Sequence, residues 1–228
     1  MSEGHRDRIV SAAARLLAQG GREAVSTRAV CAAAGVQAPT IYRIFGDKQG
    51  LLDAVAERGF AAYVGPKLHR RASGDPVEDL RSGWDLHLAF GLANPALYVL
   101  MTEPRPEGPP PAAIAGIDYL TALVQRIAEA GRLAVPVSQA VELIHASGVG
   151  ATLTVLGMPE DTRDASVSRL AREATIAAIT TDTPASSAPG PAGAAVALRA
   201  ALPDVPALSD PERALLAEWL DRIATPKG

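Results

Sequence analysis

Two short helices separated by a tight turn are predicted by residues 26–52, which read STRAVCAAAGVQAPTIYRIFGDKQGLL. Ser26 is a preferred N-cap residue for a helix over residues 27–34. Gly35 ends that helix, because glycine adopts the left-handed conformation without strain. Pro39 suits the first turn of the next helix, where a missing N–H costs little. The stretch therefore predicts two helices in close succession.

Helices are also predicted on both sides of this stretch. The upstream helix runs from about residue 6 to 19 and stops at Gly20 and Gly21. Its apolar stripe, at helical spacing, consists of Ile9, Ala12, Ala13, Leu16 and Leu17. Downstream, Gly46 and Asp47 end the third helix, and a fourth runs over about residues 48–68. Three short helices with a tight turn between the second and third are the layout of a helix-turn-helix unit, whose later helix enters the DNA major groove.

Positive charge is concentrated in the first 50 residues, although the chain has a net charge of −3. They hold seven Lys or Arg against four Asp or Glu, whereas the rest holds 15 against 21. Such a patch is either an ordinary solvated surface or a phosphate-binding one. Hydroxyl and cationic groups, which hydrogen-bond phosphate oxygens, are carried by Thr27, Arg28, Thr40, Tyr42, Arg43 and Lys48.

Residues 26–52 resemble the DNA-binding signature of the TetR family of transcriptional regulators, and the resemblance extends over about residues 6–60. It implies that Thr27 and Arg28 lie against DNA at the start of the second helix, and that Tyr42 and Lys48 hold phosphates. The recognition helix would be lined by Gln37, Ala38, Pro39, Thr40 and Arg43. Gln37 and Arg43 are the candidates for base reading, because Gln pairs with adenine and Arg with guanine.

Two positions depart from the family's commonest pattern. Ile44 stands where a histidine is frequent, which removes one phosphate contact. Gly50 stands where an acidic residue often completes the cap of the fourth helix. In a helix, Gly50 is expected to cost about 0.5–1 kcal/mol relative to alanine.

The rest of the 228-residue chain predicts further helices and no strand pairs, so the predicted fold is all-α. The expected helices span about residues 76–92, 95–101, 112–131, 137–157, 162–181, 194–202 and 209–224. A proline-rich loop is expected at 104–111 and a linker at 183–193. We therefore expect a DNA-binding head at residues 1–50, with the start of the fourth helix to about 60, and a helical ligand-binding and dimerisation body at 51–228.

The resemblance also implies a ligand pocket among the fourth to eighth helices. Its candidate lining residues are Trp84, His87, Tyr98, Met101, Tyr119 and His145, for each of which an ordinary core role is as good an interpretation. The effector is an unknown small molecule, and the aromatic content of 4% favours an aliphatic pocket.

The resemblance further implies a homodimer, formed by the helices near 137–157 and 162–181. Small residues there would permit close helix packing: Gly148, Gly150, Ala151, Ala171, Ala174, Ala177 and Ala178. A last apolar stripe that includes Trp219 either caps the body or reaches the partner.

Other classes of function find no support in the sequence. The lone Cys31 offers neither a disulfide nor a zinc cluster, and no catalytic nucleophile stands out, so we expect no enzyme, metal or cofactor. No stretch approaches the roughly 20 apolar residues of a membrane span, so a cytoplasmic protein without a membrane partner is expected.

The resemblance implies a repressor that a small molecule releases from a palindromic DNA operator. Two alternatives stay open: a TetR-like regulator that activates or needs a corepressor, and a helical interaction module that does not bind DNA.

Overall fold

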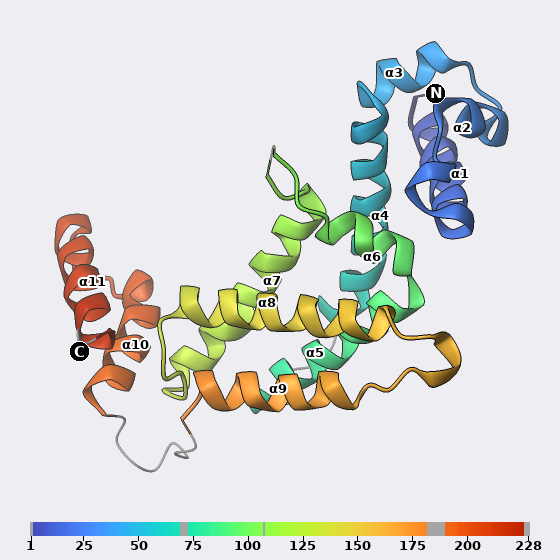
Figure 1. The fold of residues 1–228 in the computed structure, drawn as a ribbon. Coiled ribbons are helices and arrows are strands. Elements are labelled where there is room, and N and C mark those ends of the chain that lie inside the picture. The colour runs from blue at the N-terminus through green and yellow to red at the C-terminus, as the bar shows by residue number, and fades with distance from the viewer. Residues whose placement is uncertain (1, 69–72, 107, 182–189, 226–228) are drawn as a thin grey trace. The chain divides into compact units, whose positions relative to one another are not determined.

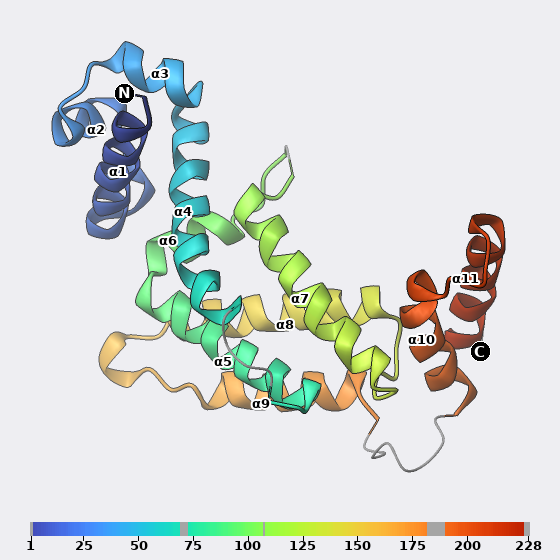
Figure 2. The same cartoon turned by 180° about the vertical axis from the view of Figure 1, so that it is seen from behind.

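The computed structural model describes residues 2–68, 73–106, 108–181 and 190–225. Within these ranges the regular structure is helical, as predicted, apart from one isolated antiparallel bridge between Leu133 and Thr180. The chain folds into two compact units, residues 1–71 with 89–116 and residues 72–88 with 117–228. Figures 1 and 2 show the helices from opposite sides.

The first helix of the first unit, α1 (Ser2–Ala24), is broken where the sequence predicts its end. Gly20 and Gly21 have non-helical backbone angles, and Gly21 has a φ of 64°, which favours glycine. The predicted apolar stripe faces the interior, because Ile9, Ala12, Ala13 and Leu17 are buried and Leu16 is half-buried.

The next two helices have the predicted ends. α2 (Thr27–Ala34) follows Ser26, whose hydroxyl accepts a hydrogen bond from a first-turn N–H at 3.2 Å. Gly35 ends α2 in the left-handed conformation, with a φ of 65°. α3 (Ala38–Phe45) carries Pro39 in its first turn. The caps that the sequence predicts therefore fix the turn between these helices.

The fourth helix, α4 (Lys48–Leu68), matches its predicted range. Gly50 near its start donates its N–H to the Asp47 carboxylate at 2.7 Å. A Cβ atom at Gly50 would lie only 2.1 Å from the carbonyl oxygen of Phe45. The expectation that alanine is the better residue here is therefore wrong, because close backbone packing outweighs helix propensity.

The first unit also contains α6 (Pro95–Thr102), and the longer helices α5 (Pro76–Ala93) and α7 (Pro111–Glu129) contribute to both units. Aromatic side chains gather beside α6. The rings of Tyr63 and Phe90 stack at 4.3 Å between centroids, and Phe60 and Tyr98 extend the group. The low aromatic content therefore does not prevent a local aromatic cluster.

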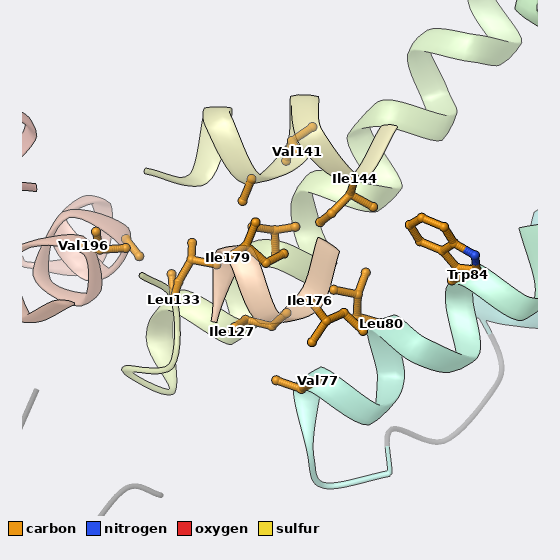
Figure 3. Close-up of a cluster of buried hydrophobic side chains, with 14 of the residues drawn as sticks. Val77, Leu80, Trp84, Ile127, Leu133, Val141, Ile144, Ile176, Ile179 and Val196 are labelled. Carbon is orange, nitrogen blue, oxygen red and sulfur yellow. The ribbon is translucent and has the colours of Figure 1, made fainter. Parts of the chain in front are cut away.

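The second unit is built from long helices around one apolar core. Besides parts of α5 and α7, its helices are α8 (Val137–Leu156), α9 (Ser166–Ile179), α10 (Pro191–Ala201) and α11 (Asp210–Ala224). Two short 3-10 turns, Glu160–Thr162 and Leu202–Asp204, lie between them. Figure 3 shows the core, in which α5, α7, α8, α9 and α10 contribute Leu80, Ile127, Ile144, Ile179 and Val196, among others.

Two predicted boundaries in this unit are wrong. α9 starts at Ser166 rather than near residue 162, because the chain first forms a 3-10 turn. Just before the helix, the carboxylate of Asp164 accepts the N–H of Ser166 at 2.8 Å. The linker predicted at 183–193 ends earlier, because Pro191 begins α10; residues 182–189 lie outside the described ranges.

The start of α11, at Asp210, agrees with the predicted range of 209–224. Ser209 and Glu212 form the reciprocal capping box, and the carboxylate of Glu212 accepts the N–H of Ser209 at 2.8 Å. The apolar stripe of α11 is divided. Leu216 and Leu220 pack in a small cluster with α10, whereas Leu215, Trp219 and Ile223 are exposed.

Candidate nucleic-acid interface

A shared apolar interior holds α2 and α3 in place. Val30 of α2 and Ile41 of α3 are essentially inaccessible, with exposures of 0% and 1%. They belong to an interior that α1 and α4 complete with Ile9, Val10, Leu51 and Leu52. Because one side of each short helix is buried here, its polar residues are directed to the surface.

All nine residues predicted to contact DNA reach the surface at least in part. The exposed ones are Arg28, Gln37, Pro39, Tyr42, Arg43 and Lys48. The half-buried ones are Thr27, Ala38 and Thr40. The structure thus brings eight of them together on α2, on α3 and at the N-cap of α3, while Lys48 opens α4.

The cations of this surface differ from several other basic residues of the first unit, which are paired with protein groups. In the described part of the chain, Arg28, Arg43 and Lys48 take part in no ion pair. By contrast, Arg22 pairs with Glu103, and Arg58 donates to the hydroxyl of Ser11 at 2.6 Å. The three cations are therefore available for phosphate or base contacts.

The helix starts differ in how they are capped. Ser26 caps α2 and Asp47 caps α4, so side chains of the protein already occupy part of those helix N-termini. Gln37 occupies the N-cap position of α3 with extended backbone angles, but its side chain forms no cap hydrogen bond. Its amide is exposed and uncommitted to capping, which suits a base-reading role.

One polar contact of this unit was not predicted. Arg105, which the sequence places in the proline-rich loop, forms an ion pair with Asp53 of α4 at 2.5 Å, and its side chain is only 9% exposed. No local pattern signals this pair, because its partners are 52 positions apart in the chain.

The six candidates for a ligand pocket are divided between the two units. Tyr98 and Met101 are buried in α6 of the first unit. Trp84, His87, Tyr119 and His145 belong to the second unit. His145 has an exposed side chain, and partial desolvation of its ring lowers the pKa of His145, which favours the neutral imidazole.

Two of these residues meet α8 in the second unit. A Cβ atom at Gly148 would lie 3.8 Å from the ring of Trp84 and 4.0 Å from that of His87, so Gly148 lets both rings approach the helix. The indole N–H of Trp84 is satisfied by Ser168 of α9. Trp84 thus has the properties of a core residue with a satisfied polar group.

An apolar outer face remains uncovered on α8 and α9. Its larger side chains are Leu143 and Leu153 on α8 and Val167 and Leu170 on α9, and Leu170 is 73% exposed. Small exposed residues continue the same faces at Ala146, Gly150, Ala174, Ala177 and Ala178. Two adjacent helices therefore present one apolar surface.

Two features, metal-holding groups and membrane-spanning helices, are absent from the described ranges. No group of three or more His, Cys, Asp or Glu side chains there is arranged to hold a metal ion. No helix among the described residues is long and apolar enough to cross a membrane.

Comparison with known proteins agrees with the geometry. The family of bacterial regulatory proteins named tetR matches residues 9–55, which contain the interface described above. No curated protein matches the chain.

Solved structures of TetR-family regulators share the fold. A TetR-family transcription regulator from Shewanella sp. PV-4 is 20% identical and has a TM-score of 0.60, with 78% of this chain and 98% of that chain covered. SmeT, the repressor of the Stenotrophomonas maltophilia multidrug efflux pump SmeDEF, is 21% identical at a TM-score of 0.59, with 81% and 94% covered. The fatty acid degradation regulator FadR from Bacillus halodurans is 18% identical at 0.59, with 75% and 94% covered.

Proposed function

We propose that this chain, which belongs to the TetR family of DNA-binding transcriptional regulators, is a homodimeric repressor that a small molecule releases from its operator. Regulators of this family are transcription factors and not enzymes. The observation that carries this proposal is the exposed group of polar and cationic residues on α2, α3 and the start of α4. The head at residues 1–50 would bind DNA, the body would bind the effector and the partner, and the protein would act in the cytoplasm.

The proposed contacts divide into two kinds. Gln37 and Arg43 read base edges in the major groove, where Ala38, Pro39 and Thr40 offer apolar contacts to thymine methyl groups. Thr27, Arg28, Tyr42 and Lys48 bind phosphates and set the register of the head. Exposure of the side chains and the lack of ion pairs at Arg28, Arg43 and Lys48 within the described ranges support the availability of these cations for DNA contacts of either kind.

The apolar face of α8 and α9 supports dimerisation. An exposed leucine such as Leu170, surrounded by small residues on two neighbouring helices, gains stability when a second copy covers it. A twofold dimer presents two recognition helices, so the operator would be palindromic, with half-sites about 34–36 Å apart or at a multiple of that spacing.

Release by an effector requires a ligand that prefers the conformation that fits DNA poorly. The candidate contacts are Trp84, His87, Tyr98, Met101, Tyr119 and His145. SmeT is a repressor of an efflux pump and FadR a regulator of fatty acid degradation, and both support a role in regulation without identifying the effector of this chain.

A reporter gene fused to the DNA upstream of the chain's own gene tests the proposal. The wild-type chain should lower reporter expression and Arg43→Ala should restore it, whereas Arg222→Ala, which removes an exposed arginine from α11, should repress normally. Expression that rises with the wild-type chain would identify an activator. The interaction module would be favoured if the wild-type chain does not change reporter expression. In that case the chain should also fail to bind this DNA in vitro when cell extract is added as a source of corepressor.

A further inference from the structure

Side chains from three segments of the first unit form a row of hydrogen bonds and ion pairs, and the backbone between the two end residues closes this row into a ring. The ring joins the end of α1, the start of α4 and the segment that follows α6. Its members are Arg22, Gln49, Asp53, Glu103 and Arg105. None of them belongs to the proposed DNA-contact surface.

The ring can be followed from one side chain to the next. Glu103 pairs with Arg22, and Arg22 Nη2 donates to Gln49 Oε1 at 2.9 Å. Gln49 Nε2 then donates to Asp53 Oδ1 at 3.0 Å. Asp53 Oδ1 also accepts from Arg105 Nη1 at 2.5 Å, and Arg105 lies two positions after Glu103, which closes the ring.

Arg105 is the least exposed of the charged members of the ring, and its Nε is buried without a hydrogen-bond partner. The side chain of Arg105 is 9% exposed and that of its partner Asp53 is 26% exposed. The second terminal nitrogen of Arg105, Nη2, donates to the carbonyl oxygen of Leu100 in α6 at 3.3 Å. Removing one partner of a shielded ion pair leaves the other charge unpaired, so such a pair holds its segments in one arrangement. The outer pair, Arg22 with Glu103, is much more open to water, with exposures of 40% and 44%.

We infer that Arg105 is a positioning residue for operator binding, which acts through Asp53, Gln49 and Arg22 to fix α1 on α4 and thereby to set the orientation of the recognition helix α3. The inference rests on the proposed DNA binding. It explains why an arginine in a proline-rich loop, with no DNA contact of its own, is held so closely by α4. A twofold dimer whose heads have one fixed orientation accepts one half-site spacing, whereas loosely held heads accept several.

The test measures the dependence of affinity on half-site spacing. Fluorescence anisotropy of the full chain is recorded with the operator and with versions whose half-sites are one or two base pairs closer or farther apart. The wild-type chain should prefer one spacing at least tenfold. Arg105→Gln and Asp53→Asn should each reduce that preference severalfold or more. The double variant should show no larger loss of preference than either single variant. The affinity for unrelated DNA, and the salt dependence of that affinity, should stay unchanged.

Arg81→Gln is the matched control, because Arg81 forms ion pairs with Glu78 and Glu173 in the second unit. It should lower the thermal midpoint without changing the spacing preference. Glu103→Gln breaks the ring at its exposed pair, and it replaces Arg105→Gln if that variant does not fold. A ring variant that folds and keeps the wild-type spacing preference overturns the inference. A wild-type chain that binds no DNA instead contradicts the proposed function itself.

Discussion

The indole N–H of Trp84 donates a hydrogen bond to the hydroxyl oxygen of Ser168 at 3.0 Å, and both residues are buried, with exposures of 5% and 1%. The bond ties α5 to α9 inside the second unit. It also occupies the polar atom through which Trp84 could bind a ligand. Any effector that contacts Trp84 would therefore meet the face of its ring and not its N–H.

Ser168→Ala is expected to destabilise the chain by about 1–3 kcal/mol, because the buried indole N–H then lacks an acceptor. Urea denaturation followed by circular dichroism measures this change. Ser138→Ala, at an exposed position of α8, serves as the control and should leave the midpoint unchanged. An unaltered midpoint for Ser168→Ala would show that the bond contributes nothing to stability.

Gly50→Ala should also destabilise the protein, although alanine is the better helix former. The added Cβ would meet the carbonyl oxygen of Phe45 at 2.1 Å, and forced overpacking of this kind costs about 1–3 kcal/mol. Thermal denaturation should show a lower midpoint for Gly50→Ala. Gly4→Ala, where a Cβ meets nothing within 4 Å, should show no such loss. A midpoint that rises for Gly50→Ala would instead mean that helix propensity decides the effect.

Arg43→Ala and Lys48→Ala should weaken DNA binding in different ways. Loss of a base contact at Arg43 removes about 1–3 kcal/mol of discrimination, roughly 5- to 150-fold in relative affinity. Loss of a phosphate contact at Lys48 weakens binding to all sequences alike and lowers the slope of log affinity against log salt by about 1. Competition assays with operator and scrambled DNA distinguish the two. Wild-type selectivity in both variants would refute the proposed contacts.

Leu170→Glu should convert the proposed dimer into monomers, because it places a charge at the most exposed apolar position of the α8 and α9 face. Sedimentation velocity reports the change. Leu215→Glu on α11 is matched in chemistry and is also exposed, at 46%. If only Leu170→Glu dissociates the dimer, α11 lies outside the interface. If both do, α11 reaches the partner, and if neither does, the proposed interface is wrong.

The helices and their caps were largely predictable because their signals are local. Ser26 and Gly35 act within one turn of the residues that they stabilise, and each is confirmed by its geometry. The wrongly predicted start of α9 also has a local cause, since a 3-10 turn and a short-range hydrogen bond at Asp164 come before the helix. Composition alone cannot distinguish such a turn from the first turn of an α-helix.

The features that the sequence did not predict depend on the three-dimensional arrangement of the chain and not on a local pattern. The steric reason for Gly50 lies in a backbone carbonyl that only the bend between α3 and α4 brings close. Arg105 meets Asp53 from 52 positions away, and Trp84 meets Ser168 from 84. Pairings at such separations leave no periodic signal in a single sequence, so the helices that carry the candidate DNA residues could be predicted and these pairings could not.

The central claim is sequence-selective DNA binding, and the most direct test is fluorescence anisotropy of the purified full chain with its own upstream DNA across a salt series. We expect selective binding that falls by about 1,000-fold or more between roughly 50 and 200 mM salt, as for a protein that contacts several phosphates. The claim would be contradicted if binding is absent or does not change with salt, both without and with cell extract as a source of effector.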